Sequence, residues 1–191
     1  MTIGVLALQG DFQAHADALQ RLGESVRLIK TPKELQGCDG LILPGGESST
    51  MLILMADDPS WFAAIKAFAL DHWLFGTCAG MILLADQVIP EQASLKLIPI
   101  EVQRNAYGRQ RDSQIKTMTY QCLDGQVLDI EVVFIRAPKI NSIAKDTAVL
   151  LEDNGVPLLV QYGPLMAASF HPESAANLSL YQDCLQRLRT S

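Results

Sequence analysis

The sequence predicts an α/β fold, a three-layer sandwich whose central sheet is mostly parallel and carries added antiparallel strands. In the first half of the chain, short continuous apolar runs alternate with helix-like stretches, which is typical of parallel strands buried on both faces. In the second half, strand-like pieces are joined by short turns that contain glycine, which predicts hairpins. The chain has 191 residues and no linker rich in proline, glycine and serine, so we expect a single domain over residues 1–191.

The first half of the chain supplies the expected parallel strands and two helices. An apolar strand at residues 3–8 is followed by apolar positions at helical spacing from residue 12 to residue 22, where Gly23 ends the helix. The same spacing at residues 61–69 predicts a second helix. Further short strands are expected at residues 26–29, 40–43 and 73–75.

The second half of the chain is expected to add hairpins to the sheet. Its turns contain Asp124-Gly125, Asn154-Gly155 and Gly163-Pro164, which are residue pairs that favour tight reversals of the backbone. A last helix is expected from about residue 177 to residue 188. The strand-like pieces lie near residues 96–102, 114–120, 132–135, 149–151, 158–161 and 165–170.

Composition and charge narrow the classes of function. Lysine and arginine total 15 against 21 for aspartate and glutamate, so the net charge is −6 and the chain lacks the basic surface that nucleic acids attract. We therefore expect a small-molecule or protein partner, and no nucleic acid or membrane. The start of the chain lacks a basic signal-peptide region, and the longest apolar stretch, around residues 73–85, is too short to cross a bilayer. We expect a soluble, cytoplasmic protein.

The cysteines and histidines do not predict a metal site. The four cysteines, at positions 38, 78, 122 and 184, form no CxxC pair and no metal-ligand spacing with the histidines at 15, 72 and 171. We expect no metal and no organic cofactor. Cys38, Cys122 and Cys184 are expected to pack in the interior, and His15 and His72 to be structural histidines.

The sharpest chemical signal is the segment Gly76-Thr77-Cys78-Ala79-Gly80, between an apolar strand and a helix-like run. It is the pattern of a nucleophile elbow, in which glycines on either side permit a tight turn that pushes the nucleophile into a cleft. At the start of a helix, the helix dipole is expected to lower the pKa of the Cys78 thiol, and the amide of Ala79 can point at a developing oxyanion. The alternative is a buried structural cysteine between unrelated glycines.

A cysteine nucleophile needs a base, and His171 is the best placed histidine because it follows the buried strand at residues 165–170. Pro172 and Glu173 come next. In an extended segment, His171 and Glu173 would project to the same side, so the carboxylate would hold the imidazole tautomer. The alternative is an unrelated pair of polar residues at the surface.

Two further segments are candidates for binding a charged substrate. Gly45 and Gly46 follow the strand at residues 40–43 and let the backbone approach a ligand, while Glu47 is able to receive an ammonium group. The alternative is a glycine turn before a helix capped by Ser48 or Ser49. Arginines are concentrated at positions 104, 109 and 111, and Arg136 follows another strand; these guanidinium groups suit a carboxylate, although a solvated loop would look alike.

Together these segments resemble the class I glutamine amidotransferase family, and within it the glutaminase subunits of pyridoxal 5′-phosphate synthases. The resemblance runs nearly end to end. The elbow and the His-Pro-Glu triplet are shared by the whole class. The Arg-Asn-Ala-Tyr-Gly-Arg-Gln and Ile-Arg-Ala-Pro stretches narrow the resemblance to the glutaminase subunits of pyridoxal 5′-phosphate synthases. The matching segments are residues 3–10, 41–50, 75–80, 104–110, 134–138 and 169–173.

The resemblance implies a triad and a substrate. Cys78 would attack the carboxamide of L-glutamine, His171 would protonate the departing ammonia and then activate water, and Glu173 would orient His171. Backbone amides of Gly46 and Ala79 would form the oxyanion hole. The residues implied to hold glutamine are Gly45, Gly46, Glu47, Arg104, Ile135 and Arg136.

The resemblance also implies a partner. Family members pass their ammonia to a separate synthase subunit, in a hetero-oligomeric ring decorated with glutaminases, and are nearly inactive without it. Two departures from the family pattern, Ala14 before His15 and Lys96 where many relatives have a nearby glycine, do not touch the triad. The competing hypotheses are the glutaminase subunit of another amidotransferase such as imidazole glycerol phosphate synthase, a cysteine peptidase or γ-glutamyl hydrolase on the same fold, and a catalytically silent binding module.

Overall fold

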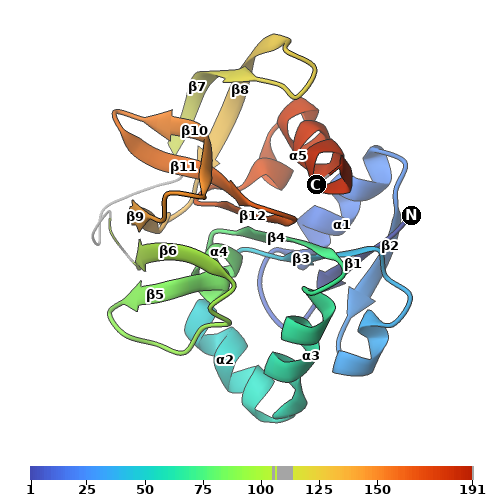
Figure 1. Cartoon of the computed structure of the whole chain (residues 1–191). Coiled ribbons are helices and arrows are strands. Elements are labelled where there is room, and N and C mark those ends of the chain that lie inside the picture. Colours follow the sequence, from blue (N-terminus) through green and yellow to red (C-terminus); the bar gives the residue numbers. More distant parts are fainter. Residues whose placement is uncertain (105, 107–113, 191) are drawn as a thin grey trace.

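The computed structural model describes residues 1–104, 106 and 114–190, and it has the three layers that the sequence predicts. Its centre is a seven-stranded sheet with the strand order β10-β11-β12-β4-β3-β1-β2 (Figure 1). Strands β2, β1, β3, β4 and β12 are parallel neighbours, and β11 pairs antiparallel with β12 and β10. The strands are β1 Thr2–Leu6, β2 Ser25–Ile29, β3 Gly40–Leu43, β4 Trp73–Thr77, β10 Ala148–Asp153, β11 Val156–Tyr162 and β12 Leu165–Ala168.

Helices cover both faces of this sheet (Figure 1). Helices α1 (Phe12–Arg21) and α5 (Ser179–Thr190) lie on one face with the hairpin β7 (Gln114–Gln121) and β8 (Val127–Phe134). The other face carries α2 Ser48–Ala56, α3 Ser60–Phe68, α4 Ala79–Leu84 and a small sheet of β5 Ala85–Ile89, β6 Ile98–Gln103 and β9 Lys139–Ile143. Two short 3₁₀ turns, η1 Pro32–Leu35 and η2 Pro172–Ser174, complete the elements.

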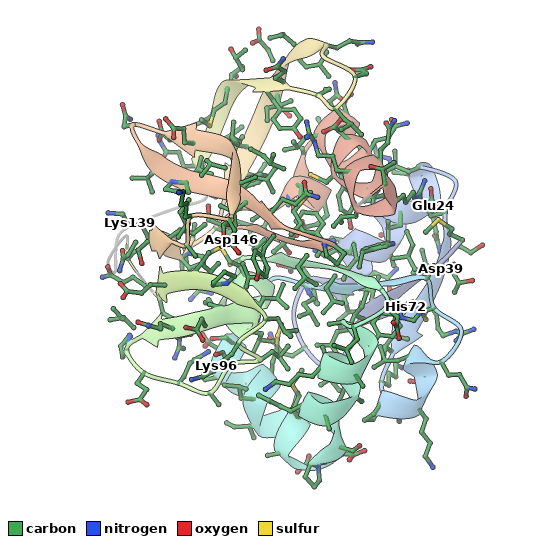
Figure 2. The ribbon with its side chains drawn as sticks, in the orientation of Figure 1. Glu24, Asp39, His72, Lys96, Lys139 and Asp146 are labelled. Carbon is green, nitrogen blue, oxygen red and sulfur yellow. The ribbon has the colours of Figure 1, made fainter. Side chains whose placement is uncertain are left out.

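Each central strand contributes side chains to two apolar cores because successive side chains point to opposite faces of the sheet. Leu41 and Leu43 of β3 pack in the core with α2 and α3, whereas Ile42 between them packs in the core with α1 and α5. In Figure 2 side chains fill the space between the layers, while the charged side chain of Asp39 lies toward the outside; Asp39 and Lys96 are both exposed. Continuous apolar runs therefore belong to strands buried on both sides, which confirms the predicted fold class.

Several elements differ from the expectation. The hairpin that turns at Asp124-Gly125 does not extend the central sheet; β7 and β8 form a two-stranded sheet of their own. Strands β5 and β9 were not predicted as elements, and helix α2 was expected only as the alternative to a ligand-binding turn. The β9 sequence, Lys139–Ile143, alternates poorly and has only Ile140 buried, so it carries no clear strand signal.

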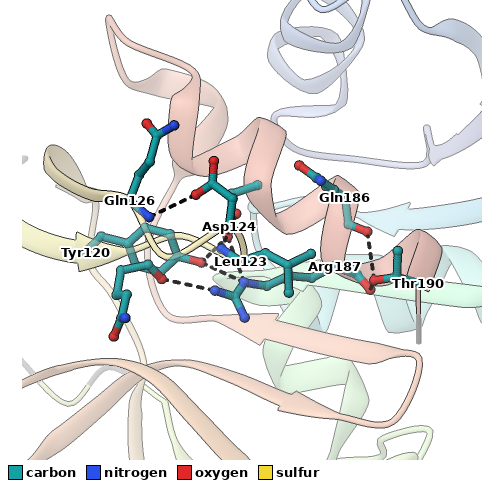
Figure 3. A network of polar contacts seen from close by, with 9 residues as sticks. Tyr120, Leu123, Asp124, Gln126, Gln186, Arg187 and Thr190 are labelled. Atoms are coloured by element: carbon teal, nitrogen blue, oxygen red, sulfur yellow. Dashed lines mark hydrogen bonds and ion pairs between the residues drawn. The ribbon is translucent and has the colours of Figure 1, made fainter.

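A buried polar network explains why the hairpin leaves the sheet. Asp183 of α5 accepts hydrogen bonds from the Tyr120 hydroxyl at 2.5 Å, the Arg187 Nε at 2.7 Å and the Leu123 amide at 2.7 Å. Arg187 also donates to the Gln121 carbonyl at 3.0 Å (Figure 3). These contacts tie β7 and its turn to α5, so the hairpin covers that helix instead of joining a strand edge. In the part of the chain that the structure describes, no helix is long and apolar enough to cross a membrane.

Candidate active site

The ends of four parallel strands meet at one edge of the sheet and form a cavity of about 310 Å³. Strand β1 leads to Gln9 and Gly10, β3 leads to Gly46 and Glu47, β4 ends next to Cys78, and β12 leads to His171. This is the edge at which open α/β sheets bind ligands. The cavity is lined by Gln9, Gly10, Asp11, Gly46, Glu47, Ser48, Cys78, Ile82, Arg104, Ile135, Arg136, Pro138 and His171.

Cys78 occupies a strained turn between β4 and α4. Its φ of 48° and ψ of −104° are unusual for a residue with a side chain, and a conformation of this kind costs about 1–3 kcal/mol. The turn closes because Gly80 lies against β3: a Cβ there would sit 1.9 Å from the Leu43 carbonyl oxygen. The Cys78 amide donates to the Ala168 carbonyl of β12 at 2.8 Å. Both flanking strands therefore hold the elbow in place.

His171 and Glu173 form a buried pair at the end of β12. His171 Nδ1 lies 2.8 Å from Glu173 Oε1, and the two side chains are 2% and 0% exposed. The expected route to this contact was wrong, because the segment is not extended. Pro172–Ser174 is a 3₁₀ turn, and it is this turn that brings Glu173 back to the imidazole.

The electrostatics favour a charged imidazole. Burial lowers the pKa of His171, but hydrogen bonds with Cys78 and Glu173, together with their negative charges, outweigh burial and raise it to about 10. Burial raises the pKa of Glu173, but His15 and the hydrogen bond from His171 lower it, and the net direction is down. With Nδ1 bound to Glu173, the other nitrogen, Nε2, is left for Cys78; it makes no other hydrogen bond within residues 1–104, 106 and 114–190.

Besides Asp11 and His171, the charged side chains of Glu47, Arg104 and Arg136 line the cavity. Glu47 Oε1 accepts a hydrogen bond from Arg104 at 3.1 Å, and Arg136 lies on the same cavity. The Ile135 carbonyl oxygen lies 3.9 Å from the Cys78 sulfur. Hydrogen bonds from Ser49 lower the pKa of Glu47, and the charges of Arg104 and Arg136 lower it further, against the opposing effect of burial.

Glu47 also begins helix α2. Its carboxylate accepts from the Ser49 amide at 3.3 Å and the Ser49 hydroxyl at 2.8 Å, so Glu47 is the N-cap, rather than Ser48 or Ser49. A helix therefore starts in this segment, as the alternative interpretation expected, but its cap is Glu47. It does not exclude ligand binding, because the Glu47 side chain is 52% exposed and lines the cavity.

The two glycines before Glu47 both allow close contacts, but only Gly46 lines the cavity. A Cβ on Gly45 would sit 2.3 Å from Cε1 of His171, so Gly45 supports the imidazole from behind. Gly46 lines the cavity with a φ of +143°, a conformation that favours glycine. Ala79 follows Cys78 and begins α4 but is not among the lining residues.

Sequence reasoning missed Gln9 and Asp11, although both follow the first strand. The Gln9 side chain accepts from the Glu47 amide at 2.8 Å, and Asp11 Oδ2 lies 3.6 Å from His171 Nδ1. The signal that was available is the position of Gln9-Gly10-Asp11 at the end of a parallel strand. The remaining arginines of the 104–111 stretch, Arg109 and Arg111, lie outside the described residues.

Among the residues described, Asp11, His171 and Glu173 have ligand atoms within 4.8 Å of one another. Because the His171–Glu173 contact is a 2.8 Å hydrogen bond, this group is a hydrogen-bonded pair beside a third carboxylate rather than an arranged metal shell. His72 lies away from the cavity and stacks on Phe68, with ring centroids 4.2 Å apart. The chemistry that the cavity supports is nucleophilic attack by sulfur on a small substrate that carries both charges.

Comparison with known proteins points the same way. The family model described as the SNO glutamine amidotransferase family matches residues 5–188. A protein of Koribacter versatilis named pyridoxal 5′-phosphate synthase subunit PdxT is 43% identical over 190 residues, covering 99% of this chain and 96% of that protein. A protein of the same name from Bacillus cytotoxicus is 46% identical over 173 residues, covering 90% of this chain and 86% of that one.

A solved structure agrees with these sequence matches. A crystal structure described as a glutamine amidotransferase superposes with a TM-score of 0.88 at 36% identity, and 98% of each chain is covered. The resemblance drawn from the sequence motifs is therefore confirmed at the level of both sequence and fold.

Proposed function

This chain belongs to the SNO glutamine amidotransferase family, and we propose that it hydrolyses L-glutamine as the glutaminase subunit of a pyridoxal 5′-phosphate synthase. The reaction converts L-glutamine and water to L-glutamate and ammonia. The observation that carries the proposal is the buried His171–Glu173 pair beside the strained Cys78 turn, in a cavity that also holds Glu47, Arg104 and Arg136.

The proposed mechanism begins with the thiolate of Cys78 and the imidazolium of His171. The thiolate attacks the carboxamide carbon, and backbone amides of Gly46 and Ala79 receive the negative charge that develops on oxygen. His171 then donates its proton from Nε2 to the departing ammonia, which leaves a thioester. In the second half His171 takes a proton from water as the water attacks the thioester, and the C–S bond then breaks, which releases L-glutamate and restores the Cys78 thiolate and the His171 imidazolium. Glu173 keeps Nδ1 protonated and the ring in place throughout.

Recognition of the amino acid is assigned to the charged groups. Glu47 binds the α-ammonium, and Arg104 with Arg136 binds the α-carboxylate, while Gly45, Gly46 and Ile135 shape the backbone around the side-chain amide. Without substrate, Glu47 and Arg104 neutralise each other at 3.1 Å. Glutamine therefore exchanges this exposed ion pair for two contacts with its own charges, which costs little because exposed pairs are weak.

The partner is the second part of the proposal. The ammonia passes to a synthase subunit that builds pyridoxal 5′-phosphate, and the two subunits form a hetero-oligomeric ring. The relatives from Koribacter versatilis and Bacillus cytotoxicus are named as pyridoxal 5′-phosphate synthase subunits, which supports the pairing with a synthase subunit. We further propose that residues 1–191 are one glutaminase domain and that the complex works in the cytoplasm.

Glutamate release from L-glutamine tests the function directly. The purified chain is assayed alone and with an equimolar amount of the synthase subunit, and Cys78→Ala is the matched control. We expect strong activation by the partner and no release by the variant. Hydrolysis of γ-glutamyl peptides by the chain alone, with glutamine left intact in both assays, would instead identify a γ-glutamyl hydrolase.

A further inference from the structure

A third histidine stands behind the triad. His15 of α1 is fully buried, and its Nε2 lies 3.4 Å from Oε2 of Glu173. Glu173 uses its other oxygen, Oε1, for His171. Its Oε2 is buried and has no hydrogen bond of good geometry among the residues that the structure describes. A buried carboxylate oxygen without a donor costs stability, so we expect the nearby ring nitrogen of His15 to serve as the donor to Oε2.

The protonation of His15 follows from its neighbours. Tyr181 of α5 places its hydroxyl 2.7 Å from Nδ1 of His15, and burial raises the pKa of Tyr181 well above its usual value, so the phenol keeps its proton. Burial also lowers the pKa of His15, so the ring is neutral and has a single N–H. Nε2 faces the carboxylate of Glu173, which only accepts, so we place the ring proton on Nε2, and the Tyr181 hydroxyl then donates to Nδ1.

The Nε2 proton of His15 lies between two acceptors, each next to a residue of the triad or part of it. Nε2 is 3.0 Å from the hydroxyl of Thr77, the residue before Cys78, and 3.4 Å from Glu173 Oε2. The charged groups that face His15 are Glu173, His171 and Asp11. A neutral ring is able to orient the carboxylate without neutralising it, so the full negative charge of Glu173 remains available to His171.

We infer that His15, fixed by Tyr181, is a positioning residue: as a neutral Nε2–H donor it holds Glu173 in the orientation that bonds His171. The inference rests on the proposed glutaminase function and deepens it. The line of contact runs from Tyr181 through His15 and Glu173 to His171, and thus from α5 and α1 to the cavity. Asp11, at 3.6 Å from His171 Nδ1, is the competing acceptor that the imidazole meets when Glu173 turns away.

The test uses three variants. His15→Leu removes the donor, His15→Gln keeps an amide N–H near the place of Nε2, and His72→Leu is the matched control at a histidine outside the cavity. At metal sites, loss of a residue that hydrogen-bonds to a ligand typically costs about 10- to 100-fold in activity, and we take this range for the analogous loss of His15 behind Glu173. We expect kcat of His15→Leu to fall by about that factor with KM unchanged, and His15→Gln to recover most of the loss, while His72→Leu behaves as wild type.

Two measurements by NMR on the histidine rings do not depend on turnover or on the partner. Nitrogen-15 shifts of the wild-type chain should show His15 neutral and protonated at Nε2 around neutral pH. The pKa of His171, about 10 in the wild type, should fall toward its ordinary value in His15→Leu and return in His15→Gln. A merely structural His15 would lower stability without moving this titration.

The outcomes separate the two proposals. A charged His15, a proton on Nδ1, or an unchanged His171 titration in His15→Leu would overturn the inference even if the enzyme hydrolyses glutamine. If His15→Leu does not fold, Tyr181→Phe removes only the hydroxyl that holds Nδ1 of His15, and an unchanged His171 titration there would overturn it equally. Absence of glutamate release by the wild type with its partner would refute the function, while the NMR result would still decide the role of His15.

Discussion

Gly45 offers a sharp test of how the imidazole is positioned. A methyl group placed on Gly45 would sit 2.3 Å from His171 Cε1, whereas ordinary contacts begin at 3.4 Å. In Gly45→Ala the ring must therefore retreat by about 1 Å, since its neighbour is a side chain and β3 is fixed in the sheet. A displacement of about 1 Å at a reacting group is enough to cost roughly 100-fold in rate.

The assay is steady-state glutamate release in the presence of the synthase subunit, with a thermal unfolding scan of each protein. We expect kcat of Gly45→Ala to fall by about 100-fold while KM changes little, because the charged groups for the amino acid are untouched. Gly125→Ala is the control: its Cβ meets nothing within 4 Å, but its φ of +86° makes the substitution strained, so it costs stability far from the cavity. Wild-type kcat in Gly45→Ala would refute the proposed position of the imidazole.

Three further results are expected from the same structure. The folded-state pKa of His171 is raised from 6.5 to about 10, so its protonation stabilises the fold fully below about pH 6.5 and this contribution should disappear as the pH rises toward 10. Denaturant titrations across this pH range measure the contribution. A contribution from His171 that stays constant would contradict the prediction. Glu47→Gln should raise KM for glutamine by about 10- to 100-fold through the loss of a charge-assisted hydrogen bond, and an unchanged KM would remove Glu47 from the substrate site. Tyr120→Phe should lower the free energy of unfolding by about 1–3 kcal/mol with kcat unchanged, because it leaves the buried Asp183 short of a donor; a loss of kcat instead would link the hairpin to catalysis.

Local geometry explains what the sequence could predict. The turn at Cys78 depends on residues within two positions of it, and the glycines at 76 and 80 are required by contacts of 2.6 and 1.9 Å that a Cβ would make. Continuous apolar runs on β3 and β4 likewise reveal strands buried on both faces, as the complete burial of both strands shows. Signals of this kind are readable because they are confined to a few consecutive residues.

Tertiary contacts explain what the sequence could not predict. His15 looks like any residue on the buried face of an amphipathic helix, and only the approach of η2 and α5 places Glu173 and Tyr181 around it. The 3₁₀ turn after His171 was likewise hidden, because Pro172 is compatible with an extended segment and with the first position of a turn. The hairpin β7–β8 lies outside the central sheet because Tyr120 of β7 bonds Asp183 of α5, which is far along the chain.

The most direct test of the whole account is to trap the acyl-enzyme. The chain and its synthase subunit are mixed with excess L-glutamine, quenched in acid within one turnover, and the Cys78 peptide is analysed by mass spectrometry. The account predicts a glutamyl group on Cys78 in the wild type, and none in Cys78→Ser analysed at the same position. Glutamate release at the full rate by Cys78→Ser, or an adduct on another residue, would contradict it.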